Sequence, residues 1–182
     1  MKKILSALLA LALAMGFAIC VVAENTEPNA QGLEPLSVES VDITAAFTDT
    51  NFRAAVYEHI GKTAPAPIYD TDVAEITSLK ISKVSLESLT NGIKSLAGLE
   101  YFTSLTYLNC RNTALRSLPA LPDGLEELYC AENKLTSLPS LPSGLRILDC
   151  QTNQLTSLPP LTDLTRLTRL NCGWNRLELL RR

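Results

Sequence analysis

The C-terminal half of the chain repeats one pattern of apolar and polar positions about every twenty residues. Leucines open successive units, which span 105–124, 125–144, 145–166 and, in part, 167–182. Each unit reads L-x-x-L-x-C-x-x-N-x-L, except that Thr113 replaces the asparagine in the first. A fixed period of this length is typical of repeat architectures in which each unit forms one turn. The pattern therefore predicts a solenoid of stacked turns.

The second leucine and the cysteine of each unit lie two residues apart, as do Leu108 and Cys110. Residues two apart share one face of a β-strand, so these side chains are predicted to point into the core while their neighbours point outward. One short strand cannot bury its apolar side alone, whereas parallel strands roughly 4.8 Å apart share a continuous core. The asparagine after the strand is expected to satisfy backbone N–H and C=O groups of the turn.

The second half of each unit carries Leu-Pro pairs, from Leu118-Pro119 to Leu158-Pro159. Proline lacks the N–H group that a helix or sheet needs, so this return limb is predicted to be extended, near polyproline II. Gly124 and Gly144 stand just before the next leucine, where we expect a tight turn with positive φ. The predicted fold class is an α/β-type repeat solenoid with short parallel strands on its concave face and an extended convex side.

Residues 45–104 predict a small helical cap followed by an irregular first repeat. Asp49 or Thr50 can cap a helix that Gly61 ends. A second short helix is expected from about Asp70 or Thr71, and residues 76–82 (ITSLKIS) read as a first strand. A cap is needed because the first strand would otherwise expose an apolar core and an unpaired edge. The residues expected on the apolar face of the first helix are Phe52, Ala55, Val56, His59 and Ile60.

The first 23 residues predict export. Lys2 and Lys3 precede an apolar run from Ile4 to Val22, and small residues up to Ala23 form a cleavage site. Contact with a membrane is expected only through this signal before cleavage, the alternatives being an uncleaved anchor or a lipid-modified Cys20. Residues 24–44 are polar and aperiodic and indicate a flexible leader. No second cap is visible in the sequence near residue 182. Either the natural protein continues, which we expect, or this end pairs with another group, or it frays.

The motifs quoted above resemble those of bacterial leucine-rich-repeat (LRR) proteins over residues 105–182. The L-P-x-L-P limbs resemble type III-secreted LRR effectors, and the cysteine in each strand resembles LRR proteins of gut-dwelling bacteria. Residues 45–104 resemble the N-terminal cap of internalin-like surface proteins. The resemblance implies a curved solenoid whose strand-lined concave face binds another molecule, expected to be a protein or alternatively a glycan.

The outward residues of the strands are the candidates for that contact. Tyr107, Tyr129 and Trp174 are the expected energetic centres, because large aromatic side chains dominate interfaces; Trp174, in the last unit, would alternatively cover that end. Charged residues on this face would either orient a partner or bridge the strands. The full expected set is Tyr107, Asn109, Arg111, Glu127, Tyr129, Ile147, Asp149, Gln151, Arg169, Asn171 and Trp174.

Cysteine and histidine usage argues against metal and catalytic chemistry. Cys110, Cys130, Cys150 and Cys172 fall in one inward column, where a disulfide between paired parallel strands needs distortion. We therefore expect buried free thiols, and four ligands in a row cannot surround a tetrahedral ion. The chain has one histidine, His59, so no nucleophile–base set arises near the repeats. A non-catalytic protein without a cofactor is predicted.

Charge argues against nucleic-acid binding, and one alternative function remains. The formal net charge is −3, and no segment has the dense basic surface that nucleic acid requires. The alternative function is the substrate-recognition part of a larger LRR effector, such as an LRR ubiquitin ligase, whose catalytic domain lies outside this sequence.

Overall fold

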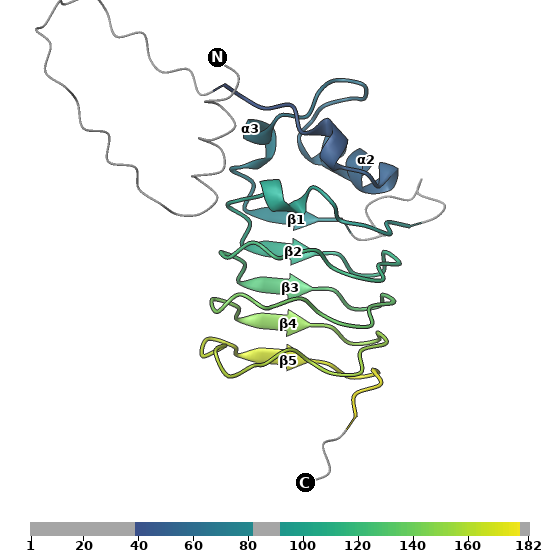
Figure 1. The fold of residues 1–182 in the computed structure, drawn as a ribbon, viewed down its shortest axis with the longest axis vertical. Helices are drawn as coiled ribbons and strands as arrows, with labels where there is room; N and C mark the ends of the chain where they lie inside the picture. The colour runs from purple at the N-terminus through teal and green to yellow at the C-terminus, as the bar shows by residue number, and fades with distance from the viewer. Residues whose placement is uncertain (1–38, 82–91, 179–182) are drawn as a thin grey trace, which may run out of the picture. The chain divides into compact units, whose positions relative to one another are not determined.

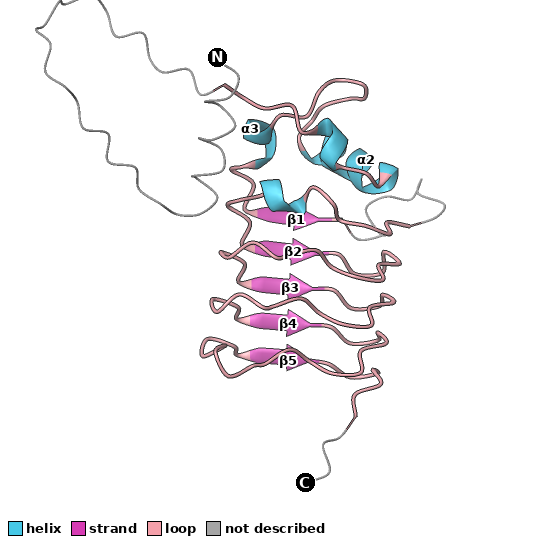
Figure 2. Cartoon of the chain, in the orientation of Figure 1, coloured by secondary structure: helices cyan, strands magenta, loops and turns pink. Residues whose placement is uncertain are grey.

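The chain forms one sheet of five short parallel strands, in which each successive turn of the solenoid contributes one strand (Figures 1 and 2). The first strand comes from the irregular turn before residue 105, and the other four come from the repeat units. The computed structural model describes residues 39–81 and 92–178; the expected signal peptide and the last four residues lie outside this part. The sheet has the order β1-β2-β3-β4-β5. The strands are β1 (Ser78–Lys80), β2 (Tyr107–Asn109), β3 (Glu127–Tyr129), β4 (Ile147–Asp149) and β5 (Arg169–Asn171).

The register confirms that one repeat makes one turn. Leu108 on β2 pairs with Leu128 on β3, which pairs with Leu148 on β4. β1 joins the same register through Leu79, which pairs with Leu108, so the segment 76–82 supplies the first strand as predicted. The predicted parallel solenoid is therefore confirmed, with five strands and a small helical N-terminal region.

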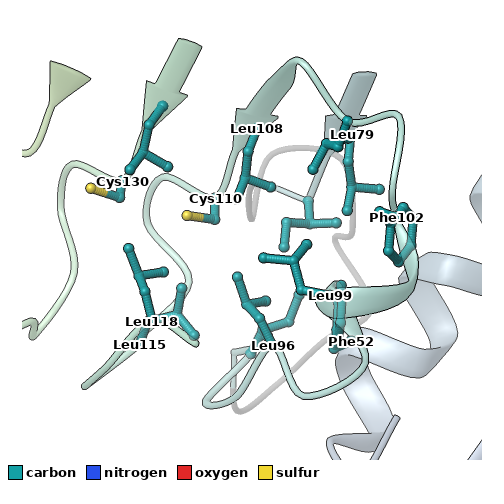
Figure 3. Close-up of a cluster of buried hydrophobic side chains, with 14 of the residues drawn as sticks. Phe52, Leu79, Leu96, Leu99, Phe102, Leu108, Cys110, Leu115, Leu118 and Cys130 are labelled. Carbon is teal, nitrogen blue, oxygen red and sulfur yellow. The ribbon is translucent and has the colours of Figure 1, made fainter. Parts of the chain in front are cut away.

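The core lies between the strands and the return limbs. Leu108, Cys110 and Cys130 are fully buried, as is Leu115 on the limb that runs back from β2. Figure 3 shows Leu108, Cys110 and Cys130 on one side of a shared apolar layer and Leu96, Leu115 and Leu118 on the other. Because each strand is only three residues long, its apolar side is covered only when turns stack against one another.

The asparagine of each repeat holds successive turns together. Asn153 Nδ2 donates to the carbonyl oxygens of Cys130 and Cys150, at 3.0 and 3.1 Å, while its Oδ1 accepts from Leu135 N at 3.0 Å. Asn133 and Asn175 make the equivalent contacts one turn before and after. These amides, of which Asn133 and Asn153 are buried, satisfy backbone groups as the sequence predicted. Each of them contacts the backbone of two turns at once.

Positive φ angles occur at one repeated position of the turn. The residue directly before the repeat asparagine (or Thr113 in the first unit) has a φ between 53 and 57°. These residues are Asn112, Glu132, Thr152 and Trp174. The expectation of positive φ at Gly124 and Gly144 is wrong, since neither is among the glycines in that region. This left-handed backbone conformation occurs three residues after the end of β2, β3, β4 and β5. It precedes Thr113 or the repeat asparagine, whose side chain can then point inward.

The return limbs of the three complete repeats contain no helix, in agreement with their prolines. The limb of the first, irregular turn differs, because it contains a short 3-10 helix, η3 (Leu99–Tyr101). Among the described residues, no helix has both the length and the apolar character needed to cross a membrane.

The cap consists of η1 (Thr44–Ala46), α2 (Thr50–His59) and α3 (Asp70–Val73). Asp49 caps α2 as predicted, accepting from Asn51 N and Phe52 N. Its second oxygen accepts from Lys94 N at 2.8 Å and Ser95 N at 3.2 Å. One carboxylate therefore joins the cap helix to the first return limb, and Phe52 is fully buried beneath this junction.

Two details of the cap differ from expectation. His59 is exposed, whereas Tyr57 is buried and its hydroxyl donates to Ala66 O at 2.6 Å. The buried face therefore follows Phe52, Ala55 and Val56 but turns away from the last residue of α2. The segment expected as a leader up to residue 44 already contributes to the fold at Ile43, which is 3% exposed.

Candidate functional site

The first and third residues of each strand point away from the core and form a continuous surface, here called the strand face. β2 and β3 show the pattern directly, with a buried leucine between two half-buried residues. The register places the outward residues of neighbouring strands side by side, for example Asn109 beside Tyr129 and Tyr129 beside Asp149. The strand face also includes the residues that follow each strand, among them Arg111, Gln151 and Trp174.

Tyr107 and Tyr129 are in contact near the middle of the strand face. Their ring centroids lie 5.4 Å apart with the planes tilted by 40°. On the β1 side, the Lys80 ammonium lies 5.6 Å from the Tyr107 ring centroid, a cation–π geometry. The Tyr107 ring is thus flanked by a lysine from one neighbouring strand and a tyrosine from the other.

The Tyr129 hydroxyl links this aromatic pair to charged residues. It donates to Glu127 Oε2 at 3.0 Å and accepts from Arg169 Nη2 at 2.9 Å. Burial raises the pKa of Tyr129, the hydrogen bond to Glu127 raises it further, and Arg169 acts in the opposite direction. The hydroxyl therefore stays protonated and bridges the two charges, and one connected network runs from β1 to β5.

Arg111 and Asp149 form a second link across the face. Arg111 Nη1 lies 3.3 Å from Asp149 Oδ2, and Arg111 Nη2 lies 3.6 Å from Glu132 Oε1. Asp149 is only 8% exposed, so its carboxylate is largely enclosed within the face. Repeat two has Ala131 at the position of Arg111, and this small residue leaves room for the guanidinium to reach β4. The alternative interpretation, salt bridging across strands, applies to this pair.

The remaining expected residues differ in how much of each side chain is exposed to solvent. Asn109, Ile147, Gln151 and Asn171 are half-buried on the strand face. Trp174 is 83% exposed, which contradicts the alternative that it covers the end of the stack. The register thus places the outward strand residues side by side, and Trp174 is the most exposed aromatic side chain among the described residues.

The sequence reasoning missed Lys80 as a member of this face. Aligning ITSLKIS with the repeats places Leu79 at the position of Leu108, so Lys80 corresponds to Asn109. The signal was present in the sequence, because the strand itself had been predicted and the alignment only needed to be extended by one turn.

The four repeat cysteines are free thiols in one column behind the strand face. Burial raises the pKa of Cys110 and of Cys150 to about 12, and it also raises the pKa of Cys130. The neighbouring thiols of Cys110 and Cys150 raise the pKa of Cys130 further. Within the described residues no group of three or more metal-ligating side chains occurs. Cys110, Cys130 and Cys150 are buried as small apolar residues of the core, as expected, whereas Cys172 is only partly buried.

Comparisons with known proteins agree with this architecture. Residues 123–161 match the family model described as Leucine Rich repeats (2 copies). The functional domain of InlJ from Listeria monocytogenes, which includes a cysteine ladder, is 30% identical with a TM-score of 0.67. An internalin (inlF) from Listeria monocytogenes, 21% identical with a TM-score of 0.60, shares the fold. None of the curated proteins matches the chain.

These similarities extend over most of the chain but over a smaller part of the solved structures. The InlJ comparison covers 76% of this chain and 30% of that one, and the inlF comparison covers 76% and 40%. The chain thus spans less than half the length of either structure. Its repeats, register, cysteine column and N-terminal helices nevertheless identify it: the chain is a leucine-rich-repeat protein related to the Listeria internalins.

Proposed function

We propose that this chain is an exported, non-catalytic binding protein that holds a protein partner against its strand face. The observation that carries the proposal is the connected network of Lys80, Tyr107, Tyr129, Glu127 and Arg169, which draws its side chains from four of the five strands. These side chains are held in place before a partner arrives. Association then loses less side-chain entropy, so preorganised faces bind more tightly than mobile ones.

The chemistry of the face favours a protein over a glycan. Sugars stack on an open aromatic ring, but at the centre of the face the Tyr107 ring is flanked by Lys80 and by Tyr129. Trp174, which is 83% exposed, is an open ring but lies away from this centre, in the turn after β5. The face combines half-buried aromatic residues with both signs of charge, a mixture suited to a protein surface of complementary potential. Exposed Lys80 and Arg169 have no carboxylate salt bridge among the described residues, so acidic groups on the partner would complement them.

The partner is tested by affinity capture with a face variant and a matched control. The variant Lys80→Glu/Arg169→Glu reverses two exposed charges without removing buried atoms. The control Arg116→Glu/Lys134→Glu makes the same charge change at exposed positions beyond the strands. Proteins retained by the native chain and by the control should be retained about tenfold less by the face variant.

Equal retention by both variants, with unchanged circular dichroism and melting temperature, would remove the strand face as the binding surface. A second variant, Tyr107→Ala/Tyr129→Ala, tests the aromatic centre of the same face. Its folding is checked in the same way, because both rings are half-buried.

Export rests on the N-terminal pattern of Lys2, Lys3 and the apolar run to Val22, together with the predicted cleavage after Ala23. Expression of the full sequence in a bacterial host should release a product whose N-terminal residue is Glu24. Intact mass spectrometry measures this directly. A product that keeps residues 1–23 would contradict cleavage.

A further inference from the structure

The two tyrosines of the strand face come from different turns, and their rings meet over the gap between β2 and β3. Tyr107 is the first residue of β2 and Tyr129 the third residue of β3, so they are diagonal neighbours in the register. The Tyr129 hydroxyl contacts Glu127, at the first position of its strand, and the Tyr107 hydroxyl accepts from Asn109 Nδ2, at the third position of its own. Each side chain thus lies along its strand toward the other, and the ring centroids are 5.4 Å apart.

This contact is the one place in the described part of the chain where two tyrosine rings meet, and that part includes all five tyrosines. Tyr57, by contrast, is buried in the cap, with its hydroxyl bound to Ala66 O. Tyr107 and Tyr129 are half-buried, so solvent reaches both. Within the described residues, a reaction that joins two tyrosine rings of one copy is therefore confined to this pair.

The Tyr129 hydroxyl has a proton acceptor in place, because it donates to Glu127 Oε2 at 3.0 Å. Loss of an electron makes the proton of a phenol far more acidic, so a carboxylate at hydrogen-bond distance takes up that proton as the electron leaves. Arg169 Nη2 donates to the same oxygen at 2.9 Å and continues to do so after the proton has moved. Burial and Glu127 raise the pKa of Tyr129, so at neutral pH the proton is still present and leaves in this way.

We propose that Tyr107 and Tyr129 form a site of oxidative cross-linking, at which a haem peroxidase and hydrogen peroxide join the two rings as dityrosine. Each tyrosine gives one electron to the oxidant, while the hydroxyl proton of Tyr129 passes to Glu127 and that of Tyr107 passes to water. The two radicals couple through one C–C bond between the ring carbons next to the hydroxyls. Those carbons release their hydrogens as protons, and a proton returns to each oxygen, in Tyr129 from Glu127. The chain thus loses two hydrogen atoms, which reduce one hydrogen peroxide to two waters.

The observed arrangement of the rings needs little change before coupling. The ring planes are tilted by 40°, and two directly joined phenol rings are likewise twisted rather than coplanar. The centroids are closer in the product than in the observed pair, and rapid rotation about the side-chain bonds of partly exposed residues supplies this approach. Because the rings are already in contact, coupling within one chain is favoured over coupling between chains. The product joins neighbouring turns covalently, so it should raise the melting temperature.

The test treats the purified chain with a haem peroxidase and hydrogen peroxide at low protein concentration. Trypsin places the two tyrosines in separate peptides, 95–111 and 117–134, so the cross-link should appear as one species that contains both and lacks two hydrogen masses. Dityrosine fluorescence should rise while the chain stays monomeric. Tyr107→Phe and Tyr129→Phe keep a ring at each position and should abolish this species. The control Tyr101→Phe, which changes a tyrosine in the same peptide as Tyr107, should react as the native chain does.

Two glutamate variants test the proton transfer. Glu127→Gln keeps an oxygen that accepts a hydrogen bond but is a far weaker base, so cross-linking should slow by about tenfold or more. Glu126→Gln, whose native carboxylate lies 3.6 Å from Arg146, should react at the native rate. Circular dichroism checks that every variant is folded.

A native chain that yields no peptide joining the two tyrosines would overturn the proposal, as would formation of the same species in Tyr107→Phe. An unchanged rate in Glu127→Gln would overturn the assignment of Glu127 as the proton acceptor. The reaction needs no partner protein, and capture of a partner is measured without peroxide. Failure of the cross-link and failure of the proposed binding are therefore distinguishable.

Discussion

Arg111, in the turn after β2, forms a salt bridge with Asp149 on β4, passing over the intervening turn. The Asp149 side chain is 11% exposed and the Arg111 side chain 34%, so the pair is partly withdrawn from water. Replacing Arg111 by Ala leaves the carboxylate without its guanidinium and should lower the free energy of unfolding by about 1 kcal/mol. A double-mutant cycle with Asp149→Asn, followed by urea unfolding, measures the coupling.

A second, more exposed salt bridge tests whether partial burial causes the coupling between Arg111 and Asp149. Arg146 Nη1 lies 3.6 Å from Glu126 Oε2 on the outside of the stack, with side chains 57% and 44% exposed. Its coupling should be below about 0.5 kcal/mol and should vanish at high salt. Equal coupling energies for the two pairs would contradict this explanation.

Asn153 should be among the most sensitive positions of the repeats. Its side chain is buried and pairs with the backbone of two turns through Leu135 N, Cys130 O and Cys150 O. Asn153→Ala leaves the buried Leu135 N without an acceptor and removes one of the two amide donors from each of Cys130 O and Cys150 O, which Asn133 and Asn175 still contact. We therefore expect a loss of about 2 to 3 kcal/mol in unfolding free energy. The neighbouring variant Gln151→Ala, at a half-buried position of the strand face, should cost below about 1 kcal/mol. Similar losses of unfolding free energy at the two positions would show that the hydrogen bonds of the repeat asparagines are not what joins the turns.

Stability should fall at alkaline pH because the buried thiols hold their protons only in the folded state. The pKa of Cys110 and of Cys150 is raised from 9.0 to about 12. The folded state therefore binds more protons than the unfolded state in this window. The contribution to stability is complete below pH 9 and declines as the pH rises toward 12. Urea midpoints across this range measure the slope.

The cysteine variants separate this effect from other alkaline titrations. Tyr129, whose pKa is also raised, contributes in the same direction, so the measurement uses Tyr129→Phe as the background. Adding Cys110→Ala and Cys150→Ala should lower stability at neutral pH, because each leaves a small cavity, yet flatten the decline above pH 9. An unchanged slope would assign the decline to other groups.

The left-handed position before each asparagine predicts stabilising substitutions. Thr152 has a φ of 55° and is exposed, and a β-branched residue is strained in that region. The first repeat has Asn112 at the same position with a φ of 54°. Thr152→Asn should therefore raise the unfolding free energy by about 0.5 to 1 kcal/mol, as read from thermal unfolding.

Two comparisons sharpen this prediction. Thr156→Asn, at an exposed position outside the left-handed region, should leave stability unchanged within about 0.5 kcal/mol. Trp174→Asn, with a φ of 53° and 83% exposure, should stabilise the fold while weakening any contact that the indole makes with a partner. A loss of stability in Thr152→Asn or in Trp174→Asn would argue against backbone strain at this position.

The sequence predicted those parts of the fold that follow from spacing alone. The two-residue interval between Leu108 and Cys110 predicted which strand side chains are buried. The asparagine that recurs after each strand, such as Asn133, predicted the hydrogen bonds to the backbone of the turn. The prolines of the return limbs correctly predicted that these limbs contain no helix. These features are local or strictly periodic, so no knowledge of tertiary contacts was needed.

The errors, and the alternatives that the sequence left open, occurred where tertiary contacts decide the outcome. Asp149 has the strand position of an outward residue, but Arg111 approaches it from two turns away, and no spacing rule reveals such a contact. Gly124 and Gly144 were assigned the left-handed turn because glycine adopts it at little cost. The fold requires that conformation at Glu132 and Thr152 instead, since the asparagine ladder fixes where the chain must bend. His59 lies at the last residue of α2, beyond the part of the helix that packs on the first turn.

The two kinds of contact between turns have different ranges, and this difference bears on how such a protein can evolve. The asparagine and backbone contacts join nearest neighbours, so a duplicated twenty-residue unit could be inserted and would find the same surroundings on both sides. The bonds from Arg111 to Asp149 and from Arg169 to Tyr129 join second neighbours. An inserted unit would leave the stack intact but separate these partners, so gene duplication could rewrite what the protein recognises without a comparable cost in folding.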